Sequence, residues 1–213
     1  MVYDFKNVSF EESEALWNDL ACKSNHSIFL THVWQSTWWE IFGDSYELKL
    51  FQMGNNDGAL GLAPMMLSNS ELSFIGNTDL FDYHDFISNS KYSPDAFYDT
   101  LISAIKNENW SKLNLPSLLP DSATLDYLPE RLRTIGCTVE VEIEDVVPGL
   151  KLTDNWEGYI GGLRKKDRHE LRRKFRRLDS AGEYQLVCSD KETLHSDIDI
   201  FLEMMAESKE DKR

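Results

Sequence analysis

A β-hairpin pattern in the first third of the chain excludes an all-helical bundle. Two extended runs, residues 46–53 and 59–67, are separated by the turn Gly54-Asn55-Asn56-Asp57-Gly58. Because glycine and asparagine tolerate positive φ, this turn favours an antiparallel hairpin. Shorter strand patterns follow at residues 71–75 and 83–87. We therefore expect this part of the chain to build a sheet.

Helical patterns lie before and after these strands. Apolar residues recur at helical spacing in residues 10–24, 31–42, 94–108 and 121–135. Two further strand patterns cover residues 112–115 and 138–147. Adjoining strands followed by strands that alternate with helices are typical of an α/β fold in which a mixed sheet is flanked by helices.

A domain boundary is expected at Pro148-Gly149, which gives a first domain of residues 1–148 and a second segment of residues 149–213. The second segment contains strand patterns at 150–152 and 184–188, with a helical pattern between them and another after them. A lone strand between helices cannot bury both of its faces. We therefore expect residues 149–213 to begin a second domain that is cut short in this chain.

The charge of the chain reverses within one helical segment. The formal net charge is −15, yet residues 164–177 contain nine Lys and Arg residues against Asp167 and Glu170, a net of +7. The nine are Arg164, Lys165, Lys166, Arg168, Arg172, Arg173, Lys174, Arg176 and Arg177. The remainder of the chain carries −22 and repels a phosphate backbone, which argues against DNA as a partner.

The basic segment predicts a helix with one apolar face and a cationic face beside it. Leu171, Phe175 and Leu178 fall at i, i+4 and i+7, and Lys165, Arg168, Arg172 and Arg176 lie beside them at helical spacing. Arginine forms bidentate contacts with phosphate and lysine adds a point charge, so Lys165, Lys166, Arg168 and Arg172 are candidates for binding an anionic substrate. Two alternatives stay open. The helix pairs with the acids of residues 140–145, or it binds nucleic acid or membrane lipid.

A second candidate site lies at Tyr83-His84-Asp85, directly after Asp82. A histidine between carboxylates can act as a general base on an incoming amine. In a strand, however, His84 points away from Tyr83 and Asp85, so an ordinary strand with one hydrogen-bonded histidine is the alternative. We expect these three residues to contact substrate rather than to transfer a proton.

Cysteine usage and the N-terminus indicate a cytoplasmic protein without a metal site. Cys22, Cys137 and Cys188 lie far apart and have no spacing suited to zinc, so we expect them to be reduced and buried. The N-terminus has neither the basic start nor the apolar run of a signal peptide. No apolar run of about 18 residues exists, so no transmembrane segment is expected.

Four segments fall in an order that resembles the FemAB-related acyltransferases of the GNAT superfamily, in particular the bacterial branch described as BioF2-like or CelD-like N-acetyltransferases. They are residues 31–43 (THVWQSTWWEIFG), 61–66 (GLAPMM), 82–86 (DYHDF) and 156–173, which end in LRKKDRHELRR. The resemblance spans nearly all of residues 28–213. It implies a GNAT-like domain in residues 1–148 and the start of a second GNAT-like domain in residues 149–213.

The resemblance also implies an activity, namely transfer of an acyl group from acyl-CoA, such as acetyl-CoA, to an amine on a small molecule or a cell-envelope precursor. The glycine-rich donor signature of GNAT enzymes is absent, so the acyl-CoA site is expected outside this chain and the chain alone is expected to be inactive. The resemblance assigns no catalytic residue. The alternatives are a non-catalytic anion-binding module and a FemAB-type peptidyltransferase that uses aminoacyl-tRNA, which the net charge of −15 disfavours.

Overall fold

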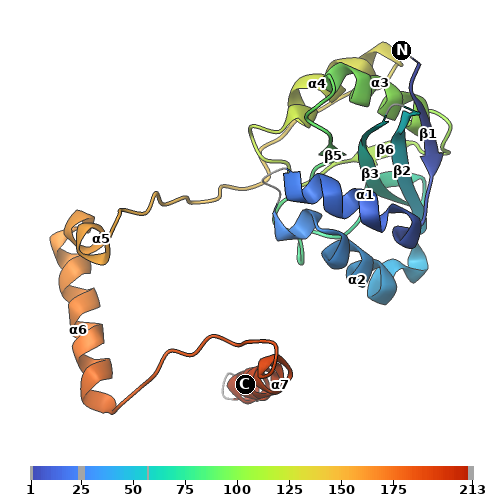
Figure 1. Cartoon of the computed structure of the whole chain (residues 1–213). Helices are drawn as coiled ribbons and strands as arrows, with labels where there is room; N and C mark the ends of the chain where they lie inside the picture. Colours follow the sequence, from blue (N-terminus) through green and yellow to red (C-terminus); the bar gives the residue numbers. More distant parts are fainter. Residues whose placement is uncertain (1, 24–26, 57, 211–213) are drawn as a thin grey trace. The chain divides into compact units, whose positions relative to one another are not determined.

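The computed structural model describes residues 2–23, 27–56 and 58–210 of the chain. Its contacts divide the chain into two compact units, residues 1–146 and residues 147–213 (Figure 1). The first unit contains the sheet. Asp57, at the predicted hairpin turn, lies outside the described residues.

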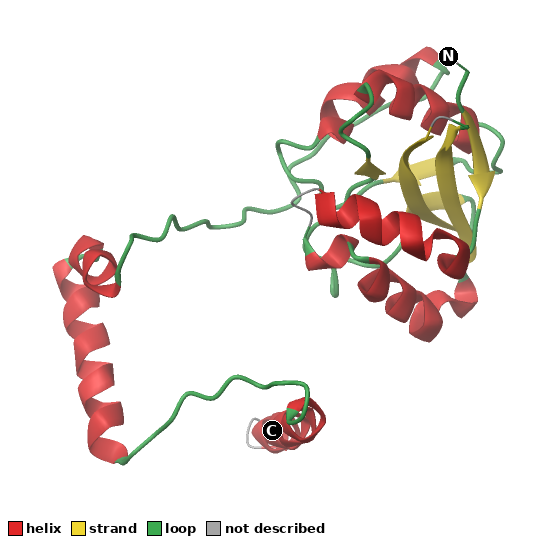
Figure 2. Ribbon diagram, in the orientation of Figure 1, coloured by secondary structure: helices red, strands yellow, loops and turns green. Residues whose placement is uncertain are grey.

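The described part of the first unit is built on a six-stranded mixed sheet (Figure 2). The strand order is β1-β2-β3-β4-β6, and β5 pairs with β3. The strands are β1 (Asp4–Asn7), β2 (Glu47–Asn55), β3 (Gly58–Ser68), β4 (Glu71–Phe74), β5 (Ile87–Ser88) and β6 (Lys112–Asn114). All pairs are antiparallel except β4 with β6, which is parallel. The predicted α/β fold with a mixed sheet is confirmed.

The predicted hairpin is the centre of this sheet. Strands β2 and β3 pair from Glu47 opposite Leu67 to Asn55 opposite Gly58, with an irregularity between Met53 and Gly54. A Cβ atom at Gly54 would lie 2.5 Å from the Gly58 carbonyl oxygen, so the irregularity requires glycine at this position.

Alternate side chains of the hairpin build two separate cores. Phe51 and Met65 belong to one cluster, whereas their neighbours Leu50 and Met66 belong to the other. Successive residues of a strand point to opposite faces of the sheet, and all four residues are buried. The sheet therefore needs a helical layer on each face.

The helices supply these two layers. Helices α3 (Pro94–Ile105) and α4 (Ala123–Thr134) cover the Phe51 face. On the other face lie α1 (Phe10–Lys23) and α2 (His32–Phe42), with the short 3-10 helices η1 (Ile28–Leu30) and η2 (Gly43–Ser45) before and after α2. Serine caps start α3 and α4, because Ser93 accepts from the Asp95 amide and Ser122 from the Thr124 amide.

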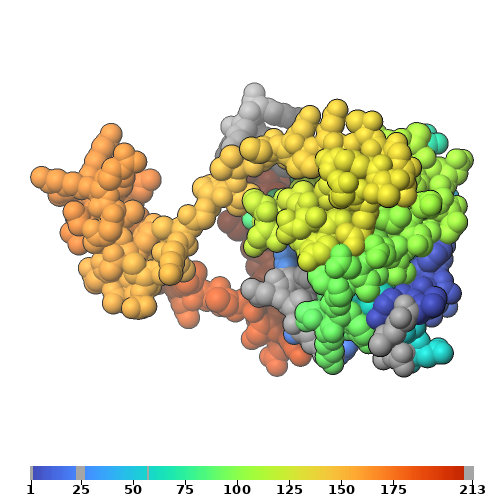
Figure 3. Space-filling view, turned by 90° about the horizontal axis from the view of Figure 1, so that it is seen from above, coloured from blue at the N-terminus to red at the C-terminus, as the bar shows by residue number. Residues whose placement is uncertain are grey.

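Several predicted strands are absent from the described chain. Residues 138–147, 150–152 and 184–188 form no strand, and of the strand predicted at 83–87 only Ile87 lies in a strand, as the first residue of β5. Val and Glu alternate in residues 138–147 as they would in a strand. No described strand lies beside this segment to pair with its backbone. This segment, coloured yellow, instead runs over the surface of the first unit (Figure 3).

The second unit consists, in its described part, of three helices and no strand. These are α5 (Trp156–Gly162), α6 (Lys165–Ala181) and α7 (Leu194–Glu210). Helix α5 packs on α6 through Trp156, whose ring lies edge-on to Phe175 at 5.8 Å between ring centroids. Asn155 caps α5 by accepting from the Gly158 amide at 2.8 Å, and Arg168 of α6 donates to the Gly161 carbonyl at 3.1 Å. Among the described helices none has the combination of length and apolar character that crossing a bilayer requires.

Gly76, two residues after β4, makes room for an aromatic ring. Its φ is +117°, and a Cβ atom would lie 2.4 Å from a ring carbon of Phe81. Gly136, after α4, also has a positive φ of +93°, but a Cβ atom there would meet nothing within 4 Å. An alanine would therefore strain the backbone at either position, but only at Gly76 would its Cβ atom also lack room.

We predict that Gly76→Ala lowers the free energy of unfolding by roughly 2–4 kcal/mol, because backbone strain of ~1 kcal/mol is added to the cost of moving a buried ring. Gly136→Ala is the matched control and should lose only ~1 kcal/mol. Urea unfolding followed by tryptophan fluorescence measures both values. Equal losses in the two variants would contradict the steric role of Gly76.

Candidate functional site

The candidate residues fall in both units of the chain. Tyr83, His84 and Asp85 lie in the first unit, in the loop between β4 and β5, whereas Lys165, Lys166, Arg168 and Arg172 lie on α6 in the second.

His84 lies between two phenylalanine rings. Its ring is stacked on Phe81 at 4.7 Å and on Phe74 at 5.4 Å between ring centroids, with interplanar angles of 11° and 4°. The residue is 2 % exposed, and its backbone amide donates to the Ser117 carbonyl at 3.1 Å. The loop backbone is thus fixed by residue 117 and not by a strand partner, which is why the predicted strand does not form here.

Neither ring nitrogen of His84 has a hydrogen-bond partner among the described residues. The alternative of an ordinary strand does not hold, because residues 83–86 form a loop, and the nearest backbone acceptor to the imidazole is the Ile75 carbonyl. Burial lowers the pKa of the His84 imidazole to about 4, while the nearby Ile75 carbonyl and the charge of Glu144 act in the opposite direction. The ring is neutral at pH 7, and leaving two buried nitrogens without partners costs roughly 1–3 kcal/mol for each unsatisfied group.

Glu144 is the charged residue that acts on His84. Its carboxylate accepts hydrogen bonds from the Ser117 amide at 2.6 Å and from the Ser117 hydroxyl at 3.3 Å. Ser117 has φ of +58°, an uncommon conformation for a residue other than glycine. Glu144, in the exposed C-terminal segment of the first unit, is therefore hydrogen-bonded to Ser117. The Ser117 carbonyl in turn accepts from the His84 amide.

Asp85 fixes the start of α4. Its carboxylate accepts from the Ser122 hydroxyl at 2.6 Å and from the Thr124 hydroxyl at 2.5 Å, and also from the Phe86 amide at 2.8 Å. Thr124 in turn is bonded to the hydroxyl of Tyr98 at 2.9 Å. Burial raises the pKa of Tyr98, so its hydroxyl stays protonated. This occupied carboxylate holds two elements together and is not presented to a ligand.

Tyr83 belongs to an aromatic cluster that sequence reasoning did not identify. It is half-buried, and its ring lies 6.1 Å from that of Phe29. Phe81 is the centre of the cluster, with Phe29, Trp34 and Trp38 at 6.1–6.3 Å.

The other buried polar atoms without a partner lie in or beside this cluster. Among the described residues they are the Ser27 hydroxyl, the Gln35 side-chain carbonyl and the Trp38 indole nitrogen. Gln35 is connected to the cluster because its side-chain amide donates to the Phe29 carbonyl at 3.2 Å. The local sequence does not indicate that Gln35 is buried, because its burial depends on the packing of α2 against residues far away in the sequence.

Helix α6 carries its charges almost without compensation. None of its residues is buried, and its carboxylate pairs are Arg173 with Glu170 at 2.6 Å and, from the N-cap, Arg164 with Asp167 at 3.5 Å. The other seven cations of residues 164–177 have no carboxylate within 4 Å in the described part of the chain. The pKa of Glu170 is lowered mainly by the hydrogen bond from Arg173. A surplus of positive charge is thus displayed along the whole helix.

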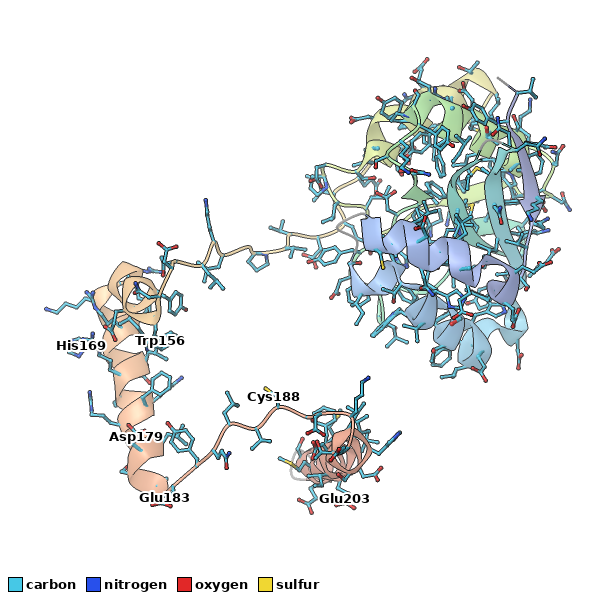
Figure 4. All side chains as sticks on the ribbon, in the orientation of Figure 1. Trp156, His169, Asp179, Glu183, Cys188 and Glu203 are labelled. Atoms are coloured by element: carbon cyan, nitrogen blue, oxygen red, sulfur yellow. The ribbon has the colours of Figure 1, made fainter. Side chains whose placement is uncertain are left out.

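The predicted residues of α6 do not share one surface. Lys166 lines a shallow hollow together with His169, Glu170, Arg173 and other side chains of the same helix. In Figure 4, His169 projects from the side of α6 opposite to Trp156. Lys165, Arg168 and Arg172 instead lie on the flank next to Leu171, where the helical repeat places them.

The three cysteines are less buried than the sequence predicted. Cys22 and Cys188 are exposed and Cys137 is half-buried, so the prediction that all three are buried is wrong, although all three are free thiols. Neither Cys22 nor Cys188 lies among the residues that form the two cores. In the described ranges no three His, Cys, Asp or Glu residues come together as metal ligands would.

We predict that His84→Phe raises the free energy of unfolding at pH 7 by about 1–2 kcal/mol, because a third phenyl ring keeps the stack and removes two unpaired nitrogens. The wild type should lose about 3 kcal/mol as the pH falls from 6.5 to 4, since the unfolded histidine binds a proton in that range and the folded one does not. This loss should be absent from the variant. Urea unfolding between pH 4 and 7.5 measures it.

His169→Gln, on the exposed surface of α6, is the control and should keep the wild-type profile. An acid loss that is the same in the wild type and in His84→Phe would show that His84 is not the group responsible.

Comparison with known proteins adds no family to this geometry. No protein-family model, curated protein or solved structure matches the chain. The resemblance to FemAB-related acyltransferases therefore stays a prediction from the order of the four segments.

Proposed function

We propose that the chain contributes the acceptor-binding part of a GNAT-type acyltransferase related to the FemAB group, which transfers an acyl group from acyl-CoA to an amine on an anionic acceptor. The proposal includes a GNAT-like identity for the mixed sheet of the first unit. The observation that carries it is the uncompensated positive charge of α6 in a chain that is otherwise strongly acidic.

Electrostatics supports α6 as the place where an anionic ligand binds. The rest of the chain carries −22 and repels anions, whereas residues 164–177 carry +7. A field of this kind directs an anion to one helix and increases its local concentration there. Arg168 and Arg172 are one helical turn apart, so two guanidinium groups can hold one phosphate-bearing group from the same side.

The chemistry demands little covalent participation from the protein. The amine nitrogen attacks the thioester carbonyl, the carbon–sulfur bond breaks, and the thiolate of CoA leaves while the amine loses a proton. Positioning the acceptor and stabilising the oxyanion are the main requirements. His84 is 2 % exposed and neutral at pH 7, so the proposal assigns no proton transfer to it.

The structure offers no donor site in residues 133–138, the string nearest to a glycine-rich pyrophosphate turn. Its amides are used to end α4, since Gly136 donates to the Arg133 carbonyl and Cys137 to the Leu132 carbonyl, each at 3.0 Å. The proposal therefore gives this segment no role in binding acyl-CoA.

One observation favours a second candidate, a non-catalytic module that binds an anionic partner. The described residues of the second unit form three helices and no strand, so they lend no support to the start of a second GNAT-like sheet. In this alternative the same face of α6 grips the partner and no acyl transfer occurs. Aminoacyl-tRNA stays the weaker variant because most of the surface repels a polyanion.

We predict that the double variant Arg168→Glu/Arg172→Glu binds inorganic pyrophosphate at least ~10-fold more weakly than the wild type, because each charge-assisted contact contributes roughly 1.5–3 kcal/mol. Lys91→Glu/Lys106→Glu, at exposed positions of the first unit, makes the same change in net charge and is the control. Titration calorimetry at low salt measures both. Equal losses in the two double variants would show a general charge effect and remove the basis of the proposal.

Acyl-CoA separates the enzyme from the binding module. We expect this chain alone to bind acetyl-CoA no more tightly than pyrophosphate, because only the phosphates find partners on α6. Tight binding that depends on the acyl group would contradict this expectation. For an acyltransferase that holds both the donor and the acceptor, the enzyme hypothesis predicts release of the CoA thiol when acetyl-CoA and an amine-bearing phosphosugar such as glucosamine 6-phosphate are supplied. The binding module predicts that the sugar binds and no thiol is released.

A further inference from the structure

Helices α5 and α6 together expose an aromatic and aliphatic surface. Trp156 is 52 % exposed, Phe175 40 % and Leu178 45 %. The rings of Trp156 and Phe175 are in edge-on contact, and Leu178 follows Phe175 by about one helical turn. These three side chains therefore form one contiguous surface, the apolar patch.

The apolar patch is too short to be the seam of a helix–helix interface. Leu171, which precedes it on α6, is half-buried, and so is Arg168, whose guanidinium donates to the Gly161 carbonyl of α5. What remains exposed on α6 spans only about one turn, whereas paired helices need apolar residues that recur over several turns. A partner helix is therefore a poor fit for this surface.

Cations lie on both flanks of the apolar patch. Seven of the nine Lys and Arg residues of 164–177 lie roughly 60–140° around the helix axis from Leu171. Those on one flank are Lys165, Arg168, Arg172 and Arg176, and those on the other are Lys166, Lys174 and Arg177. In Figure 4, His169 marks the far side of α6, opposite Trp156.

The acids on these flanks already have partners. Glu170 is paired with Arg173 at 2.6 Å and Asp167 with Arg164 at 3.5 Å. Asp179 accepts a hydrogen bond from the Tyr184 hydroxyl at 3.2 Å. The seven flanking cations are those without a carboxylate within 4 Å in the described part of the chain. An anionic surface that meets the apolar patch therefore also meets a surplus of positive charge.

An exposed tryptophan, a small apolar wedge and cations on both sides fit the surface of an anionic bilayer. The wedge leaves water for the boundary of the acyl chains, while the long stems of Lys and Arg let their charges reach the headgroups. An indole ring is favoured at that depth because its apolar body and its N–H both find suitable surroundings. A soluble phosphate or a nucleic acid, by contrast, uses the cations and leaves the apolar patch in water.

We propose that α5 and α6 dock the chain on an anionic lipid bilayer, with the apolar patch at the boundary of the acyl chains and the flanking cations among the headgroup phosphates. The docking shares Arg168 and Arg172 with the acceptor site proposed above. It does not depend on acyl transfer.

Flotation of the full chain with lipid vesicles at low salt tests the docking. Vesicles of phosphatidylglycerol and phosphatidylcholine in equal parts should bind the chain, and vesicles of phosphatidylcholine alone should bind it at least ~10-fold more weakly, because the flanking cations then lose their anionic partners. Equal binding to both kinds of vesicle would overturn the proposal. Binding to neither would overturn it as well, and would mean that another part of the chain covers the apolar patch.

The apolar patch distinguishes a bilayer from a soluble anion. Phe175→Ser/Leu178→Ser should weaken binding to the mixed vesicles by ~10-fold or more, because interfacial binding scales with buried apolar area, and should leave pyrophosphate binding unchanged. Leu186→Ser/Val187→Ser removes similar exposed side chains outside the patch and is the matched control, which should bind vesicles as the wild type does. Equal losses in the two double variants would contradict a role for the patch.

A variant that gains apolar area guards against a simple loss of folding. Leu178→Trp should strengthen binding to the mixed vesicles about 3-fold or more, because it enlarges the wedge with a side chain that prefers the interface. Circular dichroism checks that each variant keeps the helix content of the wild type. A folded Leu178→Trp variant that binds no better would overturn the placement of the patch in the bilayer.

Brominated lipids locate the residue that reaches the acyl chains. Trp156 is the only exposed tryptophan in the described chain. Bromine on the acyl chains should therefore quench its fluorescence in the bound state. Trp156→Phe, which keeps an aromatic ring beside Phe175, should bind vesicles without this quenching. Quenching that survives in the variant would show that a different part of the chain contacts the acyl chains, and would overturn the proposal.

The docking and the proposed function can fail separately. If mixed vesicles bind the chain and pyrophosphate does not, the proposed function loses its basis and the docking stands. If pyrophosphate binds and the vesicles do not, the docking is overturned and a soluble anion is the ligand of α6.

Discussion

The two-sided hairpin of β2 and β3 determines how the first unit is built. Because Leu50 and Phe51 point to opposite faces and both are buried, neither face of the sheet can be left to water. Helices α1 and α2 cover one face of the sheet, and α3 and α4 cover the other. The loop that holds His84 lies between these layers, so its geometry follows from the way the layers close around the sheet.

The two candidate sites differ in their physical character. Around His84, polar atoms without partners are surrounded by aromatic rings, and the cost of that arrangement is tolerated by a well-packed domain. On α6 the charges are exposed and nearly free of partners, so they cost little and remain available. A ligand that carries a phosphate finds chemical complementarity only at the second of these places.

Local features of the sequence predicted local structure. The turn from Gly54 to Gly58 and the apolar spacing of the helices each act within a few residues, and the hairpin and the helices formed where they were expected. Contacts between residues that lie far apart in the sequence could not be predicted from local patterns. The stack of His84 needs Phe74, and the carboxylate of Asp85 is occupied by hydroxyls 37 and 39 residues away. The strand predicted at residues 138–147 was wrong for the same reason. An alternating pattern fits a strand, but a strand forms only where a second strand lies beside it to pair with.

The edges of the sheet have a consequence for self-association. The outermost strands are β1 and β6, with four and three residues, and they present Asp4, Lys6 and Lys112 along short borders. Such borders offer few free backbone groups to an incoming strand, and their charges must be desolvated before another chain can add to them. The sheet is therefore a poor template for growth into fibres, and contacts with other molecules are left to side chains on the helices.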